Sequence, residues 1–154
     1  MPVSLQHELR QSEPFSSPEV ETVLGVIRTA ALLERGVIEA LKPHGLTPAQ
    51  YNVLRILRGA GDAGLCRHEI SGRLITPGPD VTRLLDRLDQ AGLTRRDRDP
   101  EDRRQVRATI TPRGLDVLAR LDDVLTALHR RQVGHLGTDQ LRTLSDLLAA
   151  AREA

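Results

Sequence analysis

Arginine side chains, the residues of this 154-residue sequence best suited to chemistry, are concentrated in one stretch. Residues 95–107 hold six arginines against four acidic residues, and Arg83 and Arg87 stand about one helical turn apart just before them. A guanidinium group offers a rigid fork of N–H donors that matches phosphate oxygens and the O6/N7 edge of guanine. The sequence therefore offers hydrogen bonding to anions or to a nucleic acid.

Other reactive residue types form no recognisable site. Cys66 is the only cysteine, which excludes an intramolecular disulfide and fits a reducing cytoplasm. Cys66 lies at the edge of a short predicted helix, where the two interpretations are a small residue at a helix start and a thiol sensor. The five histidines lack the spacing of metal ligands, and neither a phosphate-binding loop nor a nucleophile elbow is present. We expect no metal, no cofactor and no enzymatic activity.

Composition narrows the possible partners. Phe15 and Tyr51 are the only aromatic residues, which argues against single-stranded nucleic acid, because its bases stack on aromatic rings. The net charge is only +1, so the chain is no general nucleic-acid binder. No apolar run is long enough to cross a bilayer, so we expect no membrane contact.

Two short helices and a turn are expected to position Arg83 and Arg87. Helices over 67–74 and 79–90 flank a turn at 75–78 that contains proline and glycine, which is a helix-turn-helix signal. On a helical wheel, Arg83 lies nearly opposite the apolar face. Two interpretations stay open: a solvated face with charge pairs such as Arg83 with Asp86, or a face that reads DNA.

A β-hairpin is expected directly after the second helix. Strands over 93–98 and 105–111 flank a charged turn at 99–104, and the second strand alternates apolar and polar residues. A helix-turn-helix followed by an arginine-tipped hairpin is a winged helix, and such a tip suits the narrow, negative minor groove of DNA. The acids would hold the arginines in place or limit non-specific affinity. The alternative is an exposed turn that neutralises its own charge.

Longer helices are expected on both sides of this region. The pairs Thr47-Pro48 and Thr111-Pro112 are helix starts, with Gln50 completing a capping box at the first, and Thr138 is expected to cap the last helix. The fold class is mainly α with a small β-hairpin: a winged helix-turn-helix with long N- and C-terminal dimerisation helices.

Four segments follow from these elements. They are a flexible N-terminal arm (1–18) with at most one short helix near 5–10, a dimerisation helix (19–45), the winged helix-turn-helix (46–113) and C-terminal dimerisation helices (114–154). The arm is either disordered or wraps a partner subunit. The terminal helices hold more leucine than one domain of this size needs, which indicates a homodimer; the alternative is that they pack only on their own domain.

The order of elements and the local motifs resemble the MarR family of bacterial transcriptional regulators. The resemblance covers about Pro18 to Arg152 and rests on residues 81–88 with 91–93, on 99–104 and on 109–114. It implies a triangular dimer with interlocked terminal helices that binds a pseudo-palindromic operator, usually as a repressor. It also implies release by a small phenolic or aromatic effector or by an oxidant. Our hypothesis for the effector site is an apolar crevice between the dimer helices and the winged helix-turn-helix, bordered by Tyr51 and residues 33–44.

The resemblance also implies a set of DNA-binding residues. Thr82, Arg83 and Arg87 would be the contacts of the recognition helix. Asp102 and Arg104 match the family's wing pair, in which the arginine enters the minor groove and the aspartate orients it.

Four further residues complete the predicted site. Arg98 and Arg103 belong to it on the hairpin, and Pro79 and Asp80 sit where the helix N-terminus meets DNA. Asp80 departs from the small polar residue often found there. Its carboxylate either accepts from a cytosine amino group or acts as a helix N-terminal charge without touching DNA.

The sequence thus predicts a homodimeric, cytoplasmic regulator that binds double-stranded DNA sequence-specifically and represses until a small effector releases it. The near-neutral charge and the acids among the arginines motivate an alternative, a winged-helix protein-interaction module without DNA binding.

Overall fold

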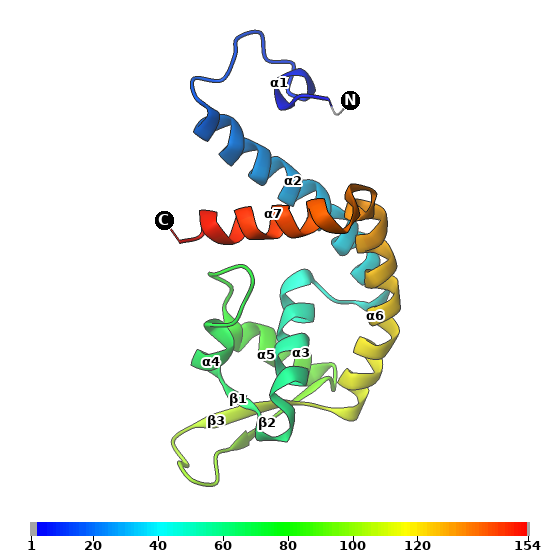
Figure 1. Cartoon of the computed structure of the whole chain (residues 1–154). Coiled ribbons are helices and arrows are strands. Elements are labelled where there is room, and N and C mark those ends of the chain that lie inside the picture. Colours follow the sequence, from blue (N-terminus) through cyan, green and yellow to red (C-terminus); the bar gives the residue numbers. More distant parts are fainter. Residues whose placement is uncertain (1–2, 154) are drawn as a thin grey trace. The chain divides into compact units, whose positions relative to one another are not determined.

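The computed structural model describes residues 3–153, which are mainly helical with one small antiparallel sheet (Figure 1). The chain divides into two compact units whose boundary in the sequence lies between Gly36 and Val37. The first unit carries α1 (Leu5–Glu8) and most of α2 (Pro18–Leu41). The second unit carries α3 (Pro48–Ala60), α4 (Arg67–Ser71), α5 (Val81–Gln90), α6 (Pro112–Val133), α7 (Gly137–Ala151), β1 (Leu65–Cys66), β2 (Thr94–Arg98), β3 (Val106–Ile110) and the 3-10 helices η1 (Lys42–His44), η2 (Gly61–Ala63) and η3 (Gly134–Leu136).

In the first unit, one short helix precedes the start of α2. The Ser4 hydroxyl accepts from the His7 N–H at 3.3 Å and caps α1, which agrees with the prediction of at most one short helix near residues 5–10. Leu5 would meet a Cβ placed on Gly25, and Glu8 lies 3.8 Å from Arg28, so α1 packs along α2. The apolar residues of α2 in this unit stay largely exposed, with Ile27 60% exposed.

In the second unit, the core lies between α3, α5, α6 and the sheet. Its fully buried aliphatic residues are Leu41, Val53, Leu54, Leu57, Ile70, Leu88, Leu118 and Leu121. The α3 start is the predicted capping box: Thr47 Oγ1 accepts from Gln50 N at 3.2 Å, and Gln50 Oε1 accepts from Thr47 N at 2.9 Å. The α6 start is also as predicted, because Thr111 Oγ1 accepts from Gly114 N at 3.1 Å.

The sheet has three strands in the order β1-β3-β2, whereas the sequence predicted only the β2–β3 hairpin. In the hairpin, Thr94 lies opposite Ile110 and Arg98 opposite Val106. The two-residue β1 pairs Leu65 with Ala108 and is too short to show any periodicity. It comes close to β3 because Gly64, at φ +61°, has no side chain: a Cβ there would lie 2.5 Å from the Ala108 carbonyl oxygen.

Three helix boundaries differ from the sequence prediction. The helix α4 ends at Ser71 rather than at Leu74, because Ile75 N turns to the Asn52 side-chain oxygen of α3 at 2.8 Å. The helix α5 starts at Val81 rather than at Pro79, because Asp80 is its N-cap. The last helix α7 begins at Gly137, so Thr138 lies inside it and does not cap it.

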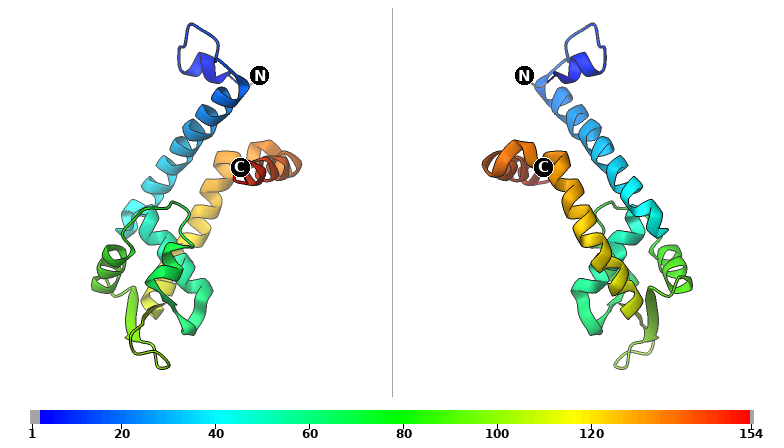
Figure 2. Two further views of the ribbon diagram at one scale, coloured as in Figure 1. Left: turned by 90° about the vertical axis from the view of Figure 1, so that its left-hand side faces the viewer. Right: turned by 90° about the vertical axis from the view of Figure 1, so that its right-hand side faces the viewer.

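The helix α6 runs away from the sheet toward α7, while the β2–β3 hairpin projects beyond the other elements of the second unit (Figure 2). On α7, Leu147 is 64% exposed, and Leu144 beside it is also exposed. Within residues 3–153, no helix has both the length and the apolar character needed to span a membrane.

Candidate nucleic-acid interface

The helix α5 buries one face and exposes the face that carries the predicted contacts. Val81, Leu85 and Leu88 are buried in the core, whereas Thr82, Arg83 and Arg87 are exposed. These sets alternate because residues three and four apart share a helix face.

Asp80 and Pro79 stand immediately before α5. Asp80 Oδ1 accepts from the N–H groups of Thr82 and Arg83, at 3.0 and 3.3 Å. This geometry is that of an N-cap, in which a carboxylate satisfies the free N–H groups of the first turn. Asp80 therefore caps the helix as an N-terminal charge, and its contact with DNA stays a prediction. Pro79 lies outside the helix and is half-buried.

The charge pair between Arg83 and Asp86, which belongs to the interpretation of α5 as a solvated face, does not form. Asp86 Oδ1 instead lies 2.6 Å from an Nη2 of Arg96 on β2, and Asp89 Oδ2 accepts from Arg96 Nε, also at 2.6 Å. The hydrogen bond to Asp86 is the main cause that raises the pKa of Arg96 above its ordinary value. Within residues 3–153, Arg83 and Arg87 form no ion pair, so their donors are free to meet a ligand.

A further contact fixes the start of the hairpin to α5. The hydroxyl of Thr94 donates to Asp89 Oδ1 at 2.5 Å, and Thr94 is buried. Together with Arg96, this contact joins β2 to the C-terminal half of α5. The helix α5 and the hairpin are therefore linked by side-chain hydrogen bonds as well as by the short connection at Gly92.

The hairpin turn is organised by Asp99. Its Oδ1 accepts from the N–H groups of Glu101 and Asp102 at 2.8 and 3.2 Å, and its Oδ2 accepts from Arg107 Nε. The hydrogen bond from Arg107, more than the two from the backbone, holds the pKa of Asp99 below its ordinary value. An aspartate before proline that bonds its own backbone two residues on is typical of a turn.

The Asp102 side chain is hydrogen-bonded to the backbone of Arg104. Asp102 Oδ1 accepts from Arg104 N at 3.1 Å, and Asp102 Oδ2 accepts from the Gln105 side-chain amide at 3.4 Å. The carboxylate thus fixes the backbone from which Arg104 projects, and the guanidinium itself stays exposed.

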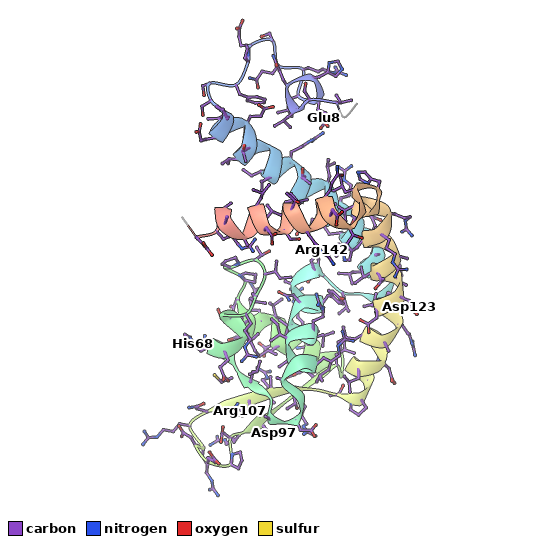
Figure 3. The ribbon with its side chains drawn as sticks, viewed as in Figure 1. Glu8, His68, Asp97, Arg107, Asp123 and Arg142 are labelled. Atoms are coloured by element: carbon purple, nitrogen blue, oxygen red, sulfur yellow. The ribbon has the colours of Figure 1, made fainter. Side chains whose placement is uncertain are left out.

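The six arginines of residues 95–107 separate into two groups. Arg95, Arg96 and Arg107 are paired with acids; Arg95 Nε lies 2.7 Å from Asp97 Oδ2, and Figure 3 places Asp97 and Arg107 on the two strands of the hairpin. The other three, Arg98, Arg103 and Arg104, are exposed and have no ion pair among the described residues. The three predicted wing arginines are those that the acids leave unpaired.

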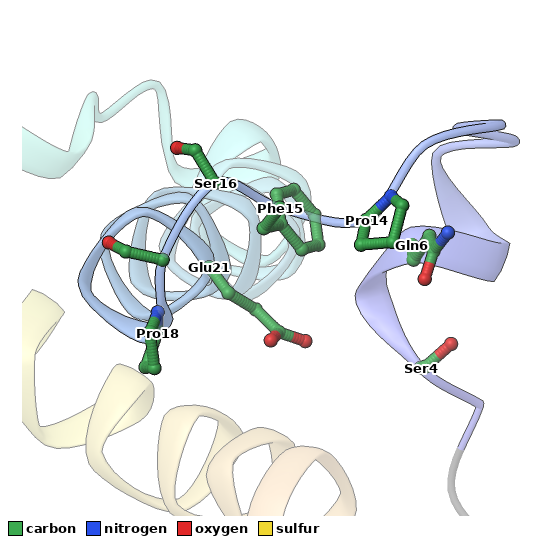
Figure 4. A pocket seen from close by; sticks show the side chains of 8 residues that line it. Ser4, Gln6, Pro14, Phe15, Ser16, Pro18 and Glu21 are labelled. Atoms are coloured by element: carbon green, nitrogen blue, oxygen red, sulfur yellow. The ribbon is translucent and has the colours of Figure 1, made fainter.

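Two hollows lie elsewhere than the expected crevice. One, of about 640 Å³, lies between α5 and the hairpin and is lined in part by Arg67, His68, Arg96 and Arg104. The other, of about 320 Å³, lies in the first unit; Figure 4 shows Phe15 and Glu21 among its lining side chains. Neither is lined by Tyr51 or by residues 33–44. Among residues 3–153, no three or more His, Cys, Asp and Glu side chains gather to hold a metal ion.

The helix-turn-helix of α4 and α5 followed by the β2–β3 hairpin defines a winged helix-turn-helix protein. Its residues 46–106 match the model of the MarR family. A transcriptional repressor, Rv2887, from Mycobacterium tuberculosis strain H37Rv is 32% identical over 124 residues, which is 79% of this chain and 86% of that protein.

Solved structures agree with this match. A MarR transcription factor from Planctomyces limnophilus is 38% identical, with 89% of this chain and 99% of that chain covered and a TM-score of 0.68. A mutant MarR from E. coli, complexed with operator DNA, is 27% identical, with 90% and 99% covered and a TM-score of 0.77. The chain belongs to the MarR family of transcriptional regulators.

The structure adds residues that the sequence did not single out. Arg96, Asp89, Asp99 and Arg107 position the hairpin, and Asn52 positions the turn before α5. Each of these residues contacts a partner that the fold or a turn brings close to it. The abundance of acids among the arginines was the one signal in the sequence that pointed to such contacts.

Proposed function

We propose that this regulator binds double-stranded DNA sequence-specifically as a homodimer, with α5 of each protomer in the major groove and each hairpin tip at the adjacent minor groove. The DNA-binding set is the predicted one: Pro79, Asp80, Thr82, Arg83, Arg87, Arg98, Asp102, Arg103 and Arg104. The half-sites would lie about 34 Å apart, one helical turn of DNA. Its work on the chromosome would place it in the cytoplasm.

The unpaired arginines on two adjoining elements carry this proposal. Arg83 and Arg87 on α5 and Arg98, Arg103 and Arg104 on the hairpin are exposed, while neighbouring arginines are neutralised by acids. A solvated surface would gain from pairing these charges as well. Free guanidinium groups instead suit phosphate and base-edge acceptors. Thr82 and the Asp80 cap lie on the same end of α5 and would set its position in the groove.

Repression is the proposed sign of regulation. Rv2887 is named a transcriptional repressor, and the E. coli MarR structure contains operator DNA. A protein that occupies an operator next to a promoter excludes the transcription machinery without needing any further contact. Repression is therefore the simplest consequence of tight operator binding.

Exposed apolar residues supply the proposed dimer surface. Ile27 and Val23 lie on α2 in the first unit, and Leu144 and Leu147 lie on α7 in the second. Exposed large apolar residues one helical turn apart, as in each of these two pairs, favour a protein contact over a solvated face. Residues 19–45 and 114–154 are accordingly proposed as the dimerisation segments.

Fluorescence anisotropy tests DNA binding directly. The probe is a labelled duplex of about 30 base pairs, long enough for two half-sites, selected from a random pool by the protein itself. We expect the affinity to fall steeply with added salt, because counterions are released at each phosphate contact. Arg83→Ala should weaken binding, whereas Arg95→Ala should not. The absence of salt-dependent duplex affinity, with a protein partner that survives high salt, would instead favour an interaction module.

A small aromatic acid is the proposed effector class. The hollow between α5 and the hairpin carries Arg67, His68 and Arg104, whereas the hollow in the first unit is lined by Glu21 and by no cation. An anion in the former would occupy space between the two DNA-contacting elements. We expect salicylate to weaken binding to the selected duplex; unchanged affinity up to millimolar salicylate would count against this class.

A further inference from the structure

A buried carboxylate lies at the base of the exposed hairpin tip. Asp99 is only 8% exposed, and among residues 3–153 it is the only charged residue that is buried. A buried charge is costly unless it is paired and hydrogen-bonded. Asp99 meets this condition with two backbone N–H groups of its own turn and with the guanidinium of Arg107.

Arg107 connects this turn to residues beside β1, at the other edge of the sheet. Its Nη1 donates to the Gly64 carbonyl at 3.2 Å and lies 3.6 Å from Glu69 Oε2. The same Glu69 oxygen accepts from Cys66 N at 2.8 Å, immediately before α4. The guanidinium thus bridges the hairpin turn and the first helix of the helix-turn-helix.

From Asp99 the contacts also run outward to the tip. Asp99 fixes the N–H of Asp102, and Asp102 Oδ1 in turn accepts from Arg104 N. The conformation from which Arg104 projects therefore depends on the Asp99 carboxylate. Neither Asp99 nor Arg107 has a free charge to offer DNA, because each is engaged by the other.

We propose that Asp99 and Arg107 are positioning residues for DNA binding, which hold the hairpin turn so that Arg104 is directed at the minor groove. The inference rests on the proposed function, since it needs Arg104 to contact DNA. Its physical basis is preorganisation: a turn already ordered before binding loses less conformational entropy when DNA arrives. Without these contacts the tip would have to be ordered by DNA itself.

A double-mutant cycle separates positioning from a general loss of stability. Asp99→Ala is made alone and together with Arg104→Ala, and each protein is titrated with the selected duplex by anisotropy. We expect Asp99→Ala to weaken binding about ten-fold in the parent, within the range of measured coupling energies. In the Arg104→Ala background it should change affinity less than about two-fold, because the residue being positioned is gone.

Conservative variants and a matched control complete the test. Asp99→Asn retains a carbonyl oxygen that accepts from the two backbone N–H groups, so it should restore most of the affinity lost in Asp99→Ala. Arg107→Gln, run through the same cycle, replaces Asp99→Ala if that variant does not fold. Asp122→Ala breaks another ion pair, with Arg58 at 2.8 Å, between α6 and α3. It should lower the melting temperature and leave duplex affinity unchanged.

The outcomes discriminate between the two proposals. If Arg104→Ala weakens binding but Asp99→Ala has no effect, or the same effect in both backgrounds, the positioning role is overturned and the DNA-binding function stands. If Arg104→Ala has no effect on affinity at any salt concentration, the hairpin does not contact DNA and both the wing assignment and the positioning role are overturned. Loss in the parent that disappears with Arg104 supports the proposal.

Discussion

Arg96 on β2 is bound to Asp86 on α5, with 2.6 Å between Nη2 and Oδ1. This ion pair takes the acid that would otherwise neutralise Arg83, four residues from Arg87 on the exposed face of α5. It also holds the hairpin against the helix. One contact therefore both leaves the helix arginines free and links the two elements that we propose to meet DNA.

Replacing Arg96 should loosen this link. We expect Arg96→Gln to lower the free energy of unfolding by about 1 kcal/mol, because a partly exposed ion pair contributes modestly and Arg96 bonds two carboxylates. Urea denaturation measures the change. The matched control is Arg95→Gln, whose pair with Asp97 is exposed, and it should stay within about 0.5 kcal/mol of the parent. Equal losses in the two variants would contradict the role of Arg96.

Substituting Gly64 should be among the most destabilising single changes in the sheet. Gly64→Ala meets both an unfavourable φ of +61° and the Ala108 carbonyl oxygen at 2.5 Å from the new Cβ. We expect a loss of about 2–4 kcal/mol. Gly59→Ala is the control: it lies within α3 with nothing near the new Cβ, and it should stabilise by about 0.5–1 kcal/mol. Thermal unfolding of both variants measures these changes in stability. If Gly64→Ala is as stable as the parent, β1 does not approach β3 this closely.

The stability of the fold should fall in acid. Hydrogen bonds, chiefly from Arg107 to Asp99 and from Arg58 to Asp122, hold the pKa of each carboxyl below its ordinary value. A lowered folded-state pKa gives a stabilisation that is fully present above the unfolded-state pKa and is lost as the pH falls through the folded-state value. The loss should therefore appear below about pH 4.

Urea denaturation between neutral pH and pH 3 tests this sign. Asp99→Asn lacks one of the two carboxyls, so its unfolding free energy should decline less steeply with acid than that of the parent. If the unfolding free energy falls with pH equally in Asp99→Asn and the parent, ionised Asp99 does not stabilise the folded state.

Charged substitutions of exposed apolar residues on α2 and α7 test the proposed dimer interface. Ile27→Glu on α2 and Leu147→Glu on α7 each place a charge on a surface that the proposed dimer buries, and we expect monomers or much weaker dimers. Sedimentation velocity at several concentrations gives the answer. Ile75→Glu is the control, because Ile75 is 77% exposed on the turn before α5, outside the proposed dimerisation segments. Unchanged dimers of both test variants would mean that these helices do not form the interface.

Local signals made much of the fold predictable from the sequence. The starts Thr47-Pro48 and Thr111-Pro112 form the expected caps, because capping involves residues three apart in the chain. The β1 strand was missed because two residues carry no period. A pair of Arg83 with Asp86 was part of one of the two interpretations that the sequence left open. In the fold, β2 brings Arg96 to the same carboxylate, and only tertiary structure shows which partner binds it.

The predicted site residues are now placed, although their contacts with DNA stay predictions. The exposed set on α5 follows from helical periodicity alone. Which hairpin arginines are free does not, since the six are similar in sequence context. Asp99 pairs with Arg107 of β3, and the register of the hairpin determines which arginine lies close to Asp99.

The salt dependence of duplex binding by Arg104→Ala, compared with Arg95→Ala, tests the central claim most directly. Both residues lie in the hairpin region, but Arg95 is already paired with Asp97, whereas Arg104 is exposed and has no ion pair among the described residues. We predict that Arg104→Ala weakens binding to the selected duplex and reduces the slope of log K against log salt by about 1 for each wing that contacts a phosphate. Arg95→Ala should match the parent. Equal affinity and slope for Arg104→Ala and the parent at every salt concentration would contradict the account.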